Sequence, residues 1–281
     1  MRALYCLIGD PVEHSVSPHM FNAAFRHGGL DDHLYVAVRV GRRELKSFVE
    51  HSRLMGFKGF NVTIPHKVAV MEFLDRLDGE AEEVGAVNTV EVASRYLKGY
   101  NTDVIAIKKI IPRRWAEDSA AAILGVGGAA RAAAIALRDL GCARQVYVGR
   151  REKTLREMGR FASMRGIEHT LLKFTSKDLD KKLGEVKIVV NATPVGMYPN
   201  TRGCPLPREM ISSGKLYLDM VYNPPETLLL RTARKRGGVV VGGLDMLVAQ
   251  AVEAFKIWMG RRPSPDAMRR AALKGLRGFR R

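Results

Sequence analysis

The feature that most constrains the fold is a strand, a tight glycine turn and a helix within residues 119–141. Ala120–Leu124 is an apolar run with the length of a buried strand, and Ala129–Leu140 has the pattern of a helix that ends at a glycine. The turn between them has the spacing G-x-G-x-x-A, formed by Gly125, Gly127 and Ala130. Glycines at these positions let the backbone approach a pyrophosphate at the helix N-terminus, where free N–H groups point outward. The segment predicts a dinucleotide-binding turn or, without a ligand, an ordinary strand-to-helix connection.

Strand and helix patterns alternate along almost all of the 281 residues, which favours an α/β architecture long enough for two domains. We expect an N-terminal α/β substrate domain, a Rossmann-type dinucleotide-binding domain, and C-terminal helices that return to the first domain. The expected bounds are 1–102 plus 244–281 for the first domain and 103–243 for the second. Helices predicted over Asp103–Ile111 and Leu244–Met259 would be the crossings between them.

The formal net charge of +17 favours anionic partners, either nucleic acid or a polyphosphate cofactor together with a carboxylate substrate. Much of the excess lies in residues 261–281, where many basic residues accompany one acid, Asp266, and one aromatic residue, Phe279. Because stacking aromatics are otherwise missing there, we interpret this tail as a solvated helical end. Nucleic-acid contact is therefore disfavoured.

The three cysteines, Cys6, Cys142 and Cys204, lie far apart and form no C-x-x-C pair. This pattern fits neither a disulfide framework nor a cysteine-based metal site, and it favours a reducing, cytoplasmic setting without a metal. The N-terminal apolar run is too short for a signal peptide, and no segment has the length of a membrane span.

Two serines precede the first predicted helix. Ser17 before Pro18 is a typical helix N-cap, for a helix that runs to Gly28-Gly29. The functional alternative is that the hydroxyls of Ser15 and Ser17, beside a helix N-terminus, hold a carboxylate.

A strand is predicted in the stretch GFNVTIPHK at residues 59–67. Asn61 and Thr63 would project to one face of this strand, and the opposite face would carry Phe60, Val62 and Ile64. Two further polar clusters follow, GAVNT at residues 85–89 and GYNTD at residues 99–103, and simple turn and cap chemistry could explain each of them.

Lys67 is the candidate proton-transfer residue. Pro65 suits a helix start, so Lys67 falls in the first turn of a helix predicted to continue through residues 68–77, where the dipole disfavours a cation by ~0.3–1 kcal/mol. A position that breaks a local rule indicates function. Asp103 is either a simple helix cap or the anionic partner that orients the Lys67 amine. His66 is expected to be a surface or packing residue and is the reserve acid–base candidate.

Basic residues follow the second strand of the nucleotide-binding half. Arg144–Val148 is predicted to be a strand that leads into Gly149, Arg150 and Arg151. A free ribose 2′-hydroxyl usually meets an acid at this point, whereas guanidinium groups suit a 2′-phosphate. The residues favour NADP, although Glu152 lies close by and a basic solvated loop is the alternative.

Two further strand ends carry turn residues. The strand predicted over Val186–Val190 precedes Thr193, and the one over Tyr217–Val221 precedes Tyr222. Open α/β sheets bind ligands at such strand ends, although plain turns explain each one separately. Gly243 opens a helix in which Gln250 faces either a cleft or solvent.

Together these stretches resemble the shikimate dehydrogenase family over residues 9–260. The motifs that carry the resemblance are GDPVEHSVSPHMFN, GFNVTIPHK, GAVNTV, GYNTD, GVGGAAR, NATPVGM, DMVYNPPETLLL and MLVAQAVEAF. The resemblance implies NADP-dependent interconversion of 3-dehydroshikimate and shikimate, on the route to chorismate and the aromatic amino acids. It also leaves a homodimer open.

The resemblance implies a role for individual residues. The catalytic pair would be Lys67 and Asp103. The substrate would be held by Ser15, Ser17, Thr63, Asn88, Asp103, Tyr222 and Gln250, with the two serines on its carboxylate. The cofactor would be held by Gly125, Gly127, Gly128, Ala129, Arg150, Arg151, Thr193, Val221, Gly243 and Met246.

Two departures from the family pattern bear on the cofactor. The family commonly has Asn-Arg-Thr after the second nucleotide strand, whereas Gly149-Arg150-Arg151 keeps only the arginine. Asp245 replaces a residue that is often small. The alternatives are a quinate or dual quinate/shikimate dehydrogenase that uses NAD, and a non-catalytic NADP-sensing module.

Overall fold

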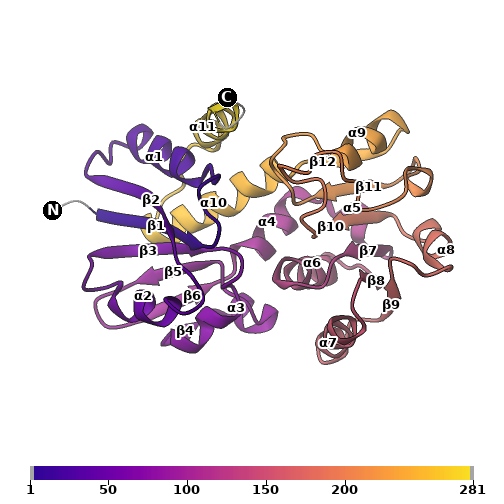
Figure 1. The fold of residues 1–281 in the computed structure, drawn as a ribbon, viewed down its shortest axis with the longest axis horizontal. Helices are drawn as coiled ribbons and strands as arrows, with labels where there is room; N and C mark the ends of the chain where they lie inside the picture. Colours follow the sequence, from indigo (N-terminus) through magenta and orange to yellow (C-terminus); the bar gives the residue numbers. More distant parts are fainter. Residues whose placement is uncertain (1–2, 279–281) are drawn as a thin grey trace. The chain divides into compact units, whose positions relative to one another are not determined.

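A computed structural model describes residues 3–278. The chain divides into two compact units: one takes the residues up to Thr102 and from Val248 onward, and the other is Asp103–Leu247 (Figure 1). The tail prediction for Phe279, Arg280 and Arg281 lies outside the described residues.

Unit 1 is built on a six-stranded sheet in the order β2-β1-β3-β5-β6-β4. Its strands are β1 (Ala3–Gly9), β2 (His33–Arg39), β3 (Phe57–Val62), β4 (Arg76–Leu77), β5 (Thr89–Val92) and β6 (Leu97–Tyr100). The first three are parallel, whereas β5 is antiparallel to both β3 and β6. The start of β5 and the end of β6 therefore lie at the same sheet edge as the carboxyl ends of β1 and β3.

Helices cover both faces of this sheet. The helical elements of unit 1 are α1 (Ser17–His27), α2 (Leu45–His51), η1 (Ala69–Phe73), α3 (Gly79–Val84), the part of α10 (Gly243–Met259) from Val248, and α11 (Pro265–Gly278). Figure 1 shows α1 and α11 side by side. On that face Tyr5 contacts Trp258, with ring centroids 5.0 Å apart, and on the other face Cys6 and Ile8 pack into the cluster beneath α2. The alternation along β1 positions both helical layers.

The helix predicted to start at Pro65 and to continue through residue 77 is wrong. The chain makes only the five-residue 3₁₀ helix η1 and then strand β4. Long-range bonds override the local pattern: the Lys67 carbonyl accepts from Val87 N at 2.7 Å, and Asp75 N donates to the Leu97 carbonyl at 3.0 Å. Lys67 thus lies in a turn and not in the first turn of an α-helix, so no α-helix dipole disfavours its charge there.

Two smaller expectations for this unit also need correction. Ser17 is the first residue of α1 and not its N-cap, which is Val16. The Val16 side chain has no hydrogen-bond acceptor for the helix N-terminus. Ser15 provides one, because its Oγ accepts from Ser17 N at 3.2 Å. β3 ends at Val62, so Thr63 follows the strand, and Ile64 is 65% exposed instead of packing with Phe60.

Unit 2 is a fully parallel six-stranded sheet in the order β12-β11-β10-β7-β8-β9. Its strands are β7 (Ala120–Leu124), β8 (Arg144–Gly149), β9 (His169–Lys173), β10 (Ile188–Asn191), β11 (Leu216–Asp219) and β12 (Val239–Val241). Counted from the first strand of the unit, this is the doubly wound order 3-2-1-4-5-6 of the Rossmann fold. The expected α/β fold with a Rossmann-type half is confirmed.

The helical elements of unit 2 are α4 (Thr102–Ile110, from Asp103), α5 (Arg113–Ala116), α6 (Gly128–Asp139), α7 (Glu152–Ser163), α8 (Leu179–Gly184), η2 (Arg208–Met210), α9 (Leu228–Lys235) and the start of α10. Alternate residues of β7, Ala120, Ala122 and Leu124, pack into a core cluster with Leu179 of α8 and Leu229 of α9. Among the described helices, none is both long and apolar enough to cross a membrane.

Candidate functional site

The glycine turn joins β7 to α6 at the point where the strand order of unit 2 reverses. Gly125 has φ +108°, a conformation that side chains disfavour, and a Cβ there would lie 2.9 Å from the Ala192 carbonyl oxygen. Gly127 is the N-cap of α6, and a Cβ there would meet no atom of the described residues within 4 Å. The turn is therefore closed on the strand side and open at the helix N-terminus, and helix N-termini in general favour anions.

The other cofactor-side candidates of unit 2 either follow the strands β10 and β11 or lie at the start of α10. The Cβ position of Gly125 is 3.2 Å from the Thr193 side chain, so the turn touches the end of β10. Gly243 packs against the backbone of Val221, where no side chain would fit. Met246 is buried. The structure thus brings the turn to Thr193, and Val221 to Gly243.

Arg150 and Arg151 follow β8 and are exposed. The nearby acid does not engage them: the Glu152 carboxylate accepts from Lys173 at 2.8 Å and lies 3.5 Å from Arg156. The hydrogen bond from Lys173 lowers the pKa of Glu152. Within residues 3–278 neither arginine makes an ion pair, so both guanidinium groups can receive an anion.

The substrate-side candidates of unit 1 gather at one edge of its sheet. Val62 at the end of β3 pairs with Ile8 of β1, and Thr89 at the start of β5 pairs with Tyr100 at the end of β6. This edge consequently carries Ser15, Ser17, Thr63, Lys67, Asn88 and Thr102. Thr63 sits directly against the end of β1, where its N–H donates to the Ile8 carbonyl at 2.9 Å.

A buried hydrogen-bond network ties this edge to α10. Asn88 Oδ1 accepts from Thr102 N at 2.9 Å, and Asn88 Nδ2 donates to Thr102 Oγ1 at 3.0 Å. Thr102 Oγ1 lies 3.3 Å from Gln250 Oε1. Asn88 is 3% exposed, and these bonds fix its side-chain amide in one orientation.

The network continues inward through residues that were not among the predicted site set. Asn61 Nδ2 donates to Thr89 Oγ1 at 2.9 Å, and Tyr35 Oη donates to Asn61 Oδ1 at 2.7 Å. Thr89 Oγ1 in turn donates to Asn88 Oδ1 at 3.0 Å. The signal in the sequence was Asn61 on the polar face of its strand, but its partners lie 26 to 28 residues away and follow only from strand pairing.

The two serines lie together, with Ser15 Oγ 3.2 Å from Ser17 Oγ. Ser17 is 6% exposed, whereas Ser15 is half-buried at the entrance to α1. The pair has the chemistry of a carboxylate cradle, because two hydroxyl donors lie side by side at a helix N-terminus.

Lys67 is half-buried in the turn after β3, and Asp103 is 5% exposed in the first turn of α4. The two residues belong to different units, so their pairing stays a prediction. His66 is buried and its Nε2 lies 2.6 Å from the Val40 carbonyl, which makes it the expected packing residue.

Two further residues of unit 2 are Tyr222, which belongs to the predicted substrate set, and Asp245, which departs from the family pattern. Tyr222, a predicted substrate residue, follows β11 and is half-buried. Asp245 Oδ2 accepts from Gly242 N at 3.3 Å, so this acid caps the start of α10.

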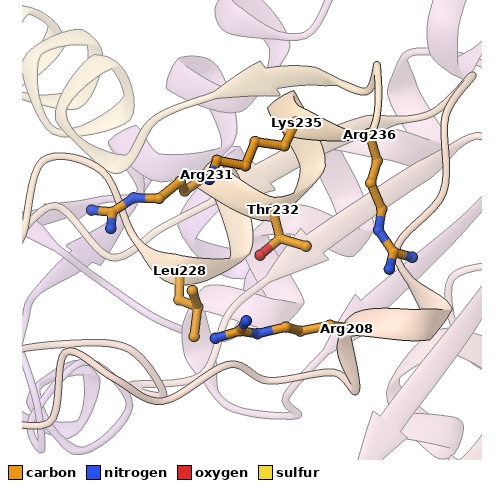
Figure 2. A pocket seen from close by; sticks show the side chains of 6 residues that line it. All are labelled: Arg208, Leu228, Arg231, Thr232, Lys235 and Arg236. Atoms are coloured by element: carbon orange, nitrogen blue, oxygen red, sulfur yellow. The ribbon is translucent and has the colours of Figure 1, made fainter.

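A cavity of about 370 Å³ lies elsewhere in unit 2 (Figure 2). It is lined by Arg208 of η2, by Leu228, Arg231, Thr232 and Lys235 of α9, and by Arg236 directly after α9. Figure 2 shows the Arg208 side chain reaching toward Leu228 and Thr232. None of the predicted site residues lines it, so this cavity is separate from the glycine turn. Among residues 3–278 no group of three or more His, Cys, Asp or Glu side chains could hold a metal ion.

Two family models match the chain: the shikimate dehydrogenase substrate binding domain over residues 7–90 and the shikimate 5′-dehydrogenase C-terminal domain over residues 243–273. A shikimate dehydrogenase (NADP+) of Archaeoglobus fulgidus is 40% identical over 271 residues, which cover 96% of this chain and 98% of the relative. The chain belongs to the shikimate dehydrogenase family.

Solved structures of similar proteins cover the whole architecture. That of shikimate 5-dehydrogenase from Thermus thermophilus, in complex with NADP(H) and shikimate, has a TM-score of 0.86 and 33% identity, and covers 97% of this chain and 99% of that one. That of quinate dehydrogenase from Corynebacterium glutamicum, in complex with NAD, has a TM-score of 0.87 and 28% identity, with coverage of 97% and 99%. Because the fold is common to both, the residues of the site decide between the two activities.

Proposed function

We propose that the chain catalyses the reversible NADP-dependent reduction of 3-dehydroshikimate to shikimate, a step toward chorismate and the aromatic amino acids. The observation that supports the proposal is that one chain combines two features. The first is a dinucleotide turn followed by Arg150, which makes no ion pair within residues 3–278. The second is a polar sheet edge that includes Lys67. The proposal assigns the edge of unit 1 to the substrate and the turn of unit 2 to the cofactor.

The cofactor side has the chemistry that NADP requires. Gly125, Gly127, Gly128 and Ala129 would meet the pyrophosphate through backbone N–H groups, and Arg150 with Arg151 would bind the 2′-phosphate. Thr193, Val221, Gly243 and Met246 would line the nicotinamide half. When bound, NADPH supplies the hydride that the substrate carbonyl carbon takes up.

The substrate side supplies position and a proton. Ser15 and Ser17 would hold the carboxylate, and hydroxyl groups of the ring would meet Thr63, Asn88, Asp103, Tyr222 and Gln250. Lys67 would donate a proton to the carbonyl oxygen as the carbon is reduced, and would take it back in the reverse direction. Asp103 would orient the Lys67 amine by a charge-assisted hydrogen bond.

The direct test is NADPH oxidation, followed by its absorbance, with 3-dehydroshikimate as substrate and with NADH as the matched cofactor. We expect turnover with NADPH and a higher KM for NADH, because NADH lacks the phosphate for Arg150. A chain that turns over quinate with NAD faster than shikimate with NADP has the alternative activity, for which the similarity to a quinate dehydrogenase is the supporting observation. Binding of NADPH without any turnover would support the sensing module instead.

The proposed binding partner is the small-molecule acid 3-dehydroshikimate or shikimate, and nucleic acid is not proposed as a partner. The proposal also includes a homodimer and a cytoplasmic location. The location is supported by the three free cysteines, of which Cys6 is buried and has its pKa raised by that burial. Light scattering after size-exclusion chromatography measures the dimer directly, and a monomer at all concentrations would contradict it.

A further inference from the structure

One buried carboxylate connects the two loops that follow β10 and β11. Asp219 is the last residue of β11, pairs in register with Asn191 at the end of β10, and is 0% exposed. Its oxygens accept three hydrogen bonds, from Asn191, Val221 and Thr227. Burial raises the pKa of the Asp219 carboxyl to about 6.

The two oxygens of Asp219 serve different segments. Oδ1 accepts from Asn191 Nδ2 at 2.9 Å and from Val221 N at 3.0 Å. Oδ2 accepts from Thr227 Oγ1 at 2.6 Å, and Thr227 is the N-cap of α9. Oδ1 therefore acts on the loops, whereas Oδ2 anchors the carboxylate to a helix.

From Asn191 the bonds continue to Thr193. Asn191 Oδ1 accepts from Thr193 N at 3.1 Å and from Thr193 Oγ1 at 2.7 Å, and Thr193 Oγ1 accepts from Val195 N at 3.2 Å. The orientation of the Asn191 amide is set by Asp219, because a carboxylate accepts and so faces the NH₂ end. Asp219 thus determines the Asn191 orientation that holds Thr193, and holds Val221 directly.

We propose that Asp219 is a positioning residue. It fixes the separation between Thr193, in the loop after β10, and Val221, in the loop after β11, and these two loops receive the nicotinamide half of the cofactor. The inference rests on the proposed function, which assigns those loops to NADP. It assigns Asp219 no contact with the cofactor. Burying a carboxylate is costly unless donors surround it, and here two of its three donors, Asn191 and Val221, belong to the segments that it positions.

The test compares variants that break one side of the carboxylate at a time. Asn191→Leu removes the Asn191 bond on the loop side and leaves that of Val221 N, whereas Thr227→Val removes the bond on the helix side. Asp219→Ala removes all three bonds, and Asp219→Asn keeps an acceptor at Oδ1. NADPH affinity is measured by the fluorescence of the bound reduced cofactor, which needs no turnover, and stability is measured by thermal unfolding. KM for NADPH and for 3-dehydroshikimate are measured in parallel.

We expect Asn191→Leu and Asp219→Ala to raise the NADPH dissociation constant about tenfold, the effect of one or two lost hydrogen bonds. Thr227→Val lowers the melting temperature but leaves that constant within about twofold, and Asp219→Asn restores most of the affinity. KM for 3-dehydroshikimate changes less than KM for NADPH in every variant.

Equal losses of affinity in Thr227→Val and Asn191→Leu would overturn the proposal, because Asp219 would then act only through stability. If Asp219→Ala does not fold, Asn191→Leu against Thr227→Val decides the question. If the wild-type chain binds NADPH but does not reduce 3-dehydroshikimate, the proposed reaction is contradicted. The NADPH dissociation constants of the variants would still test the role of Asp219. A wild-type chain that binds no NADPH overturns both.

Discussion

The position of Lys67, the candidate proton donor, depends on bonds made by its backbone and by its neighbour His66. Lys67 is held by its own carbonyl, which accepts from Val87 N, and by His66, whose ring is bonded to the Val40 carbonyl. These anchors involve the Lys67 backbone and the neighbouring ring, so they do not depend on the Lys67 amine. A change at Lys67 should therefore affect chemistry more than folding.

Lys67→Ala should lower kcat by about 10²–10⁴-fold, the usual contribution of a positioned proton donor. NADPH affinity, measured by fluorescence, should stay within about twofold, because the residue lies in unit 1 and the glycine turn in unit 2. The exposed Lys58 on β3 provides a matched control, Lys58→Ala, that removes the same charge. A kcat for Lys67→Ala near that of the control would remove Lys67 from the mechanism.

Arg150→Gln should raise KM for NADPH by about tenfold or more and leave KM for NADH nearly unchanged, because only NADPH carries the 2′-phosphate. Arg208→Gln removes the same charge from the cavity at α9 and should change neither value by more than about twofold. Parallel changes for both cofactors would show that Arg150 acts through general electrostatics instead of the phosphate.

The pKa of Asp219 gives a stability prediction with a definite sign. Its folded value of about 6 lies above the ordinary value of 3.8, so the folded chain holds the proton more tightly than the unfolded chain. Unfolding free energy should consequently fall as pH rises through this window, by about 3 kcal/mol in all. Urea unfolding of wild type and Asp219→Asn from about pH 4 to about pH 7 measures the difference. Curves that stay parallel across this range would contradict the assignment.

At the scale of elements, helix α8 ends on a buried lysine. Lys215 Nζ donates to the carbonyls of Leu183, Gly184 and Val186, with the last at 2.9 Å, and its side chain is 7% exposed. These are carbonyls at and just beyond the end of a helix, which need an external donor. Lys215 thus satisfies the carbonyl groups at the end of α8, which at other helix ends are satisfied by backbone N–H groups of a glycine turn.

Lys215→Met should destabilise the chain by about 1–3 kcal/mol, because the carbonyls lose their charged donor in a buried place. The expected result is a lower melting temperature with unchanged KM for NADPH, since α8 carries none of the predicted cofactor residues. The exposed neighbouring pair provides a control: Lys182→Met removes a surface bond to Glu185 and should cost at most ~1 kcal/mol. Equal losses in the two variants would contradict the capping role.

Elements with strong local signals were predicted within one or two residues, including β7, α4, α6 and α10. Their bounds are set by apolar periodicity and by glycines such as Gly141, which has φ +91°. The segment after Pro65 had an equally good helical pattern and was predicted wrongly. There the pairing of β4 with β6 and the bond from Val87 to Lys67 take the backbone groups that a helix needs.

At the scale of the whole molecule, two sheets of different construction carry the two halves of the proposed site. The parallel sheet of unit 2 places the glycine turn at the reversal of strand order, where such sheets bind ligands. The mixed sheet of unit 1 turns β5 around, so that Asn88 bonds to Val62 at the end of β3 and to Tyr100 at the end of β6. The large positive charge is consistent with two anionic ligands and needs no nucleic acid.

The sequence by itself determined the dinucleotide turn, the basic residues after the second nucleotide strand, and the family, because each depends on residues close together in the chain. Tertiary structure alone decided that His66 packs, that Lys67 lies in a turn, and that Asn61 joins Asn88 in one network. It also decided that Asp219 lies between two loops. The physical reason is that buried polar groups must find partners, and the partners available depend on which strands become neighbours.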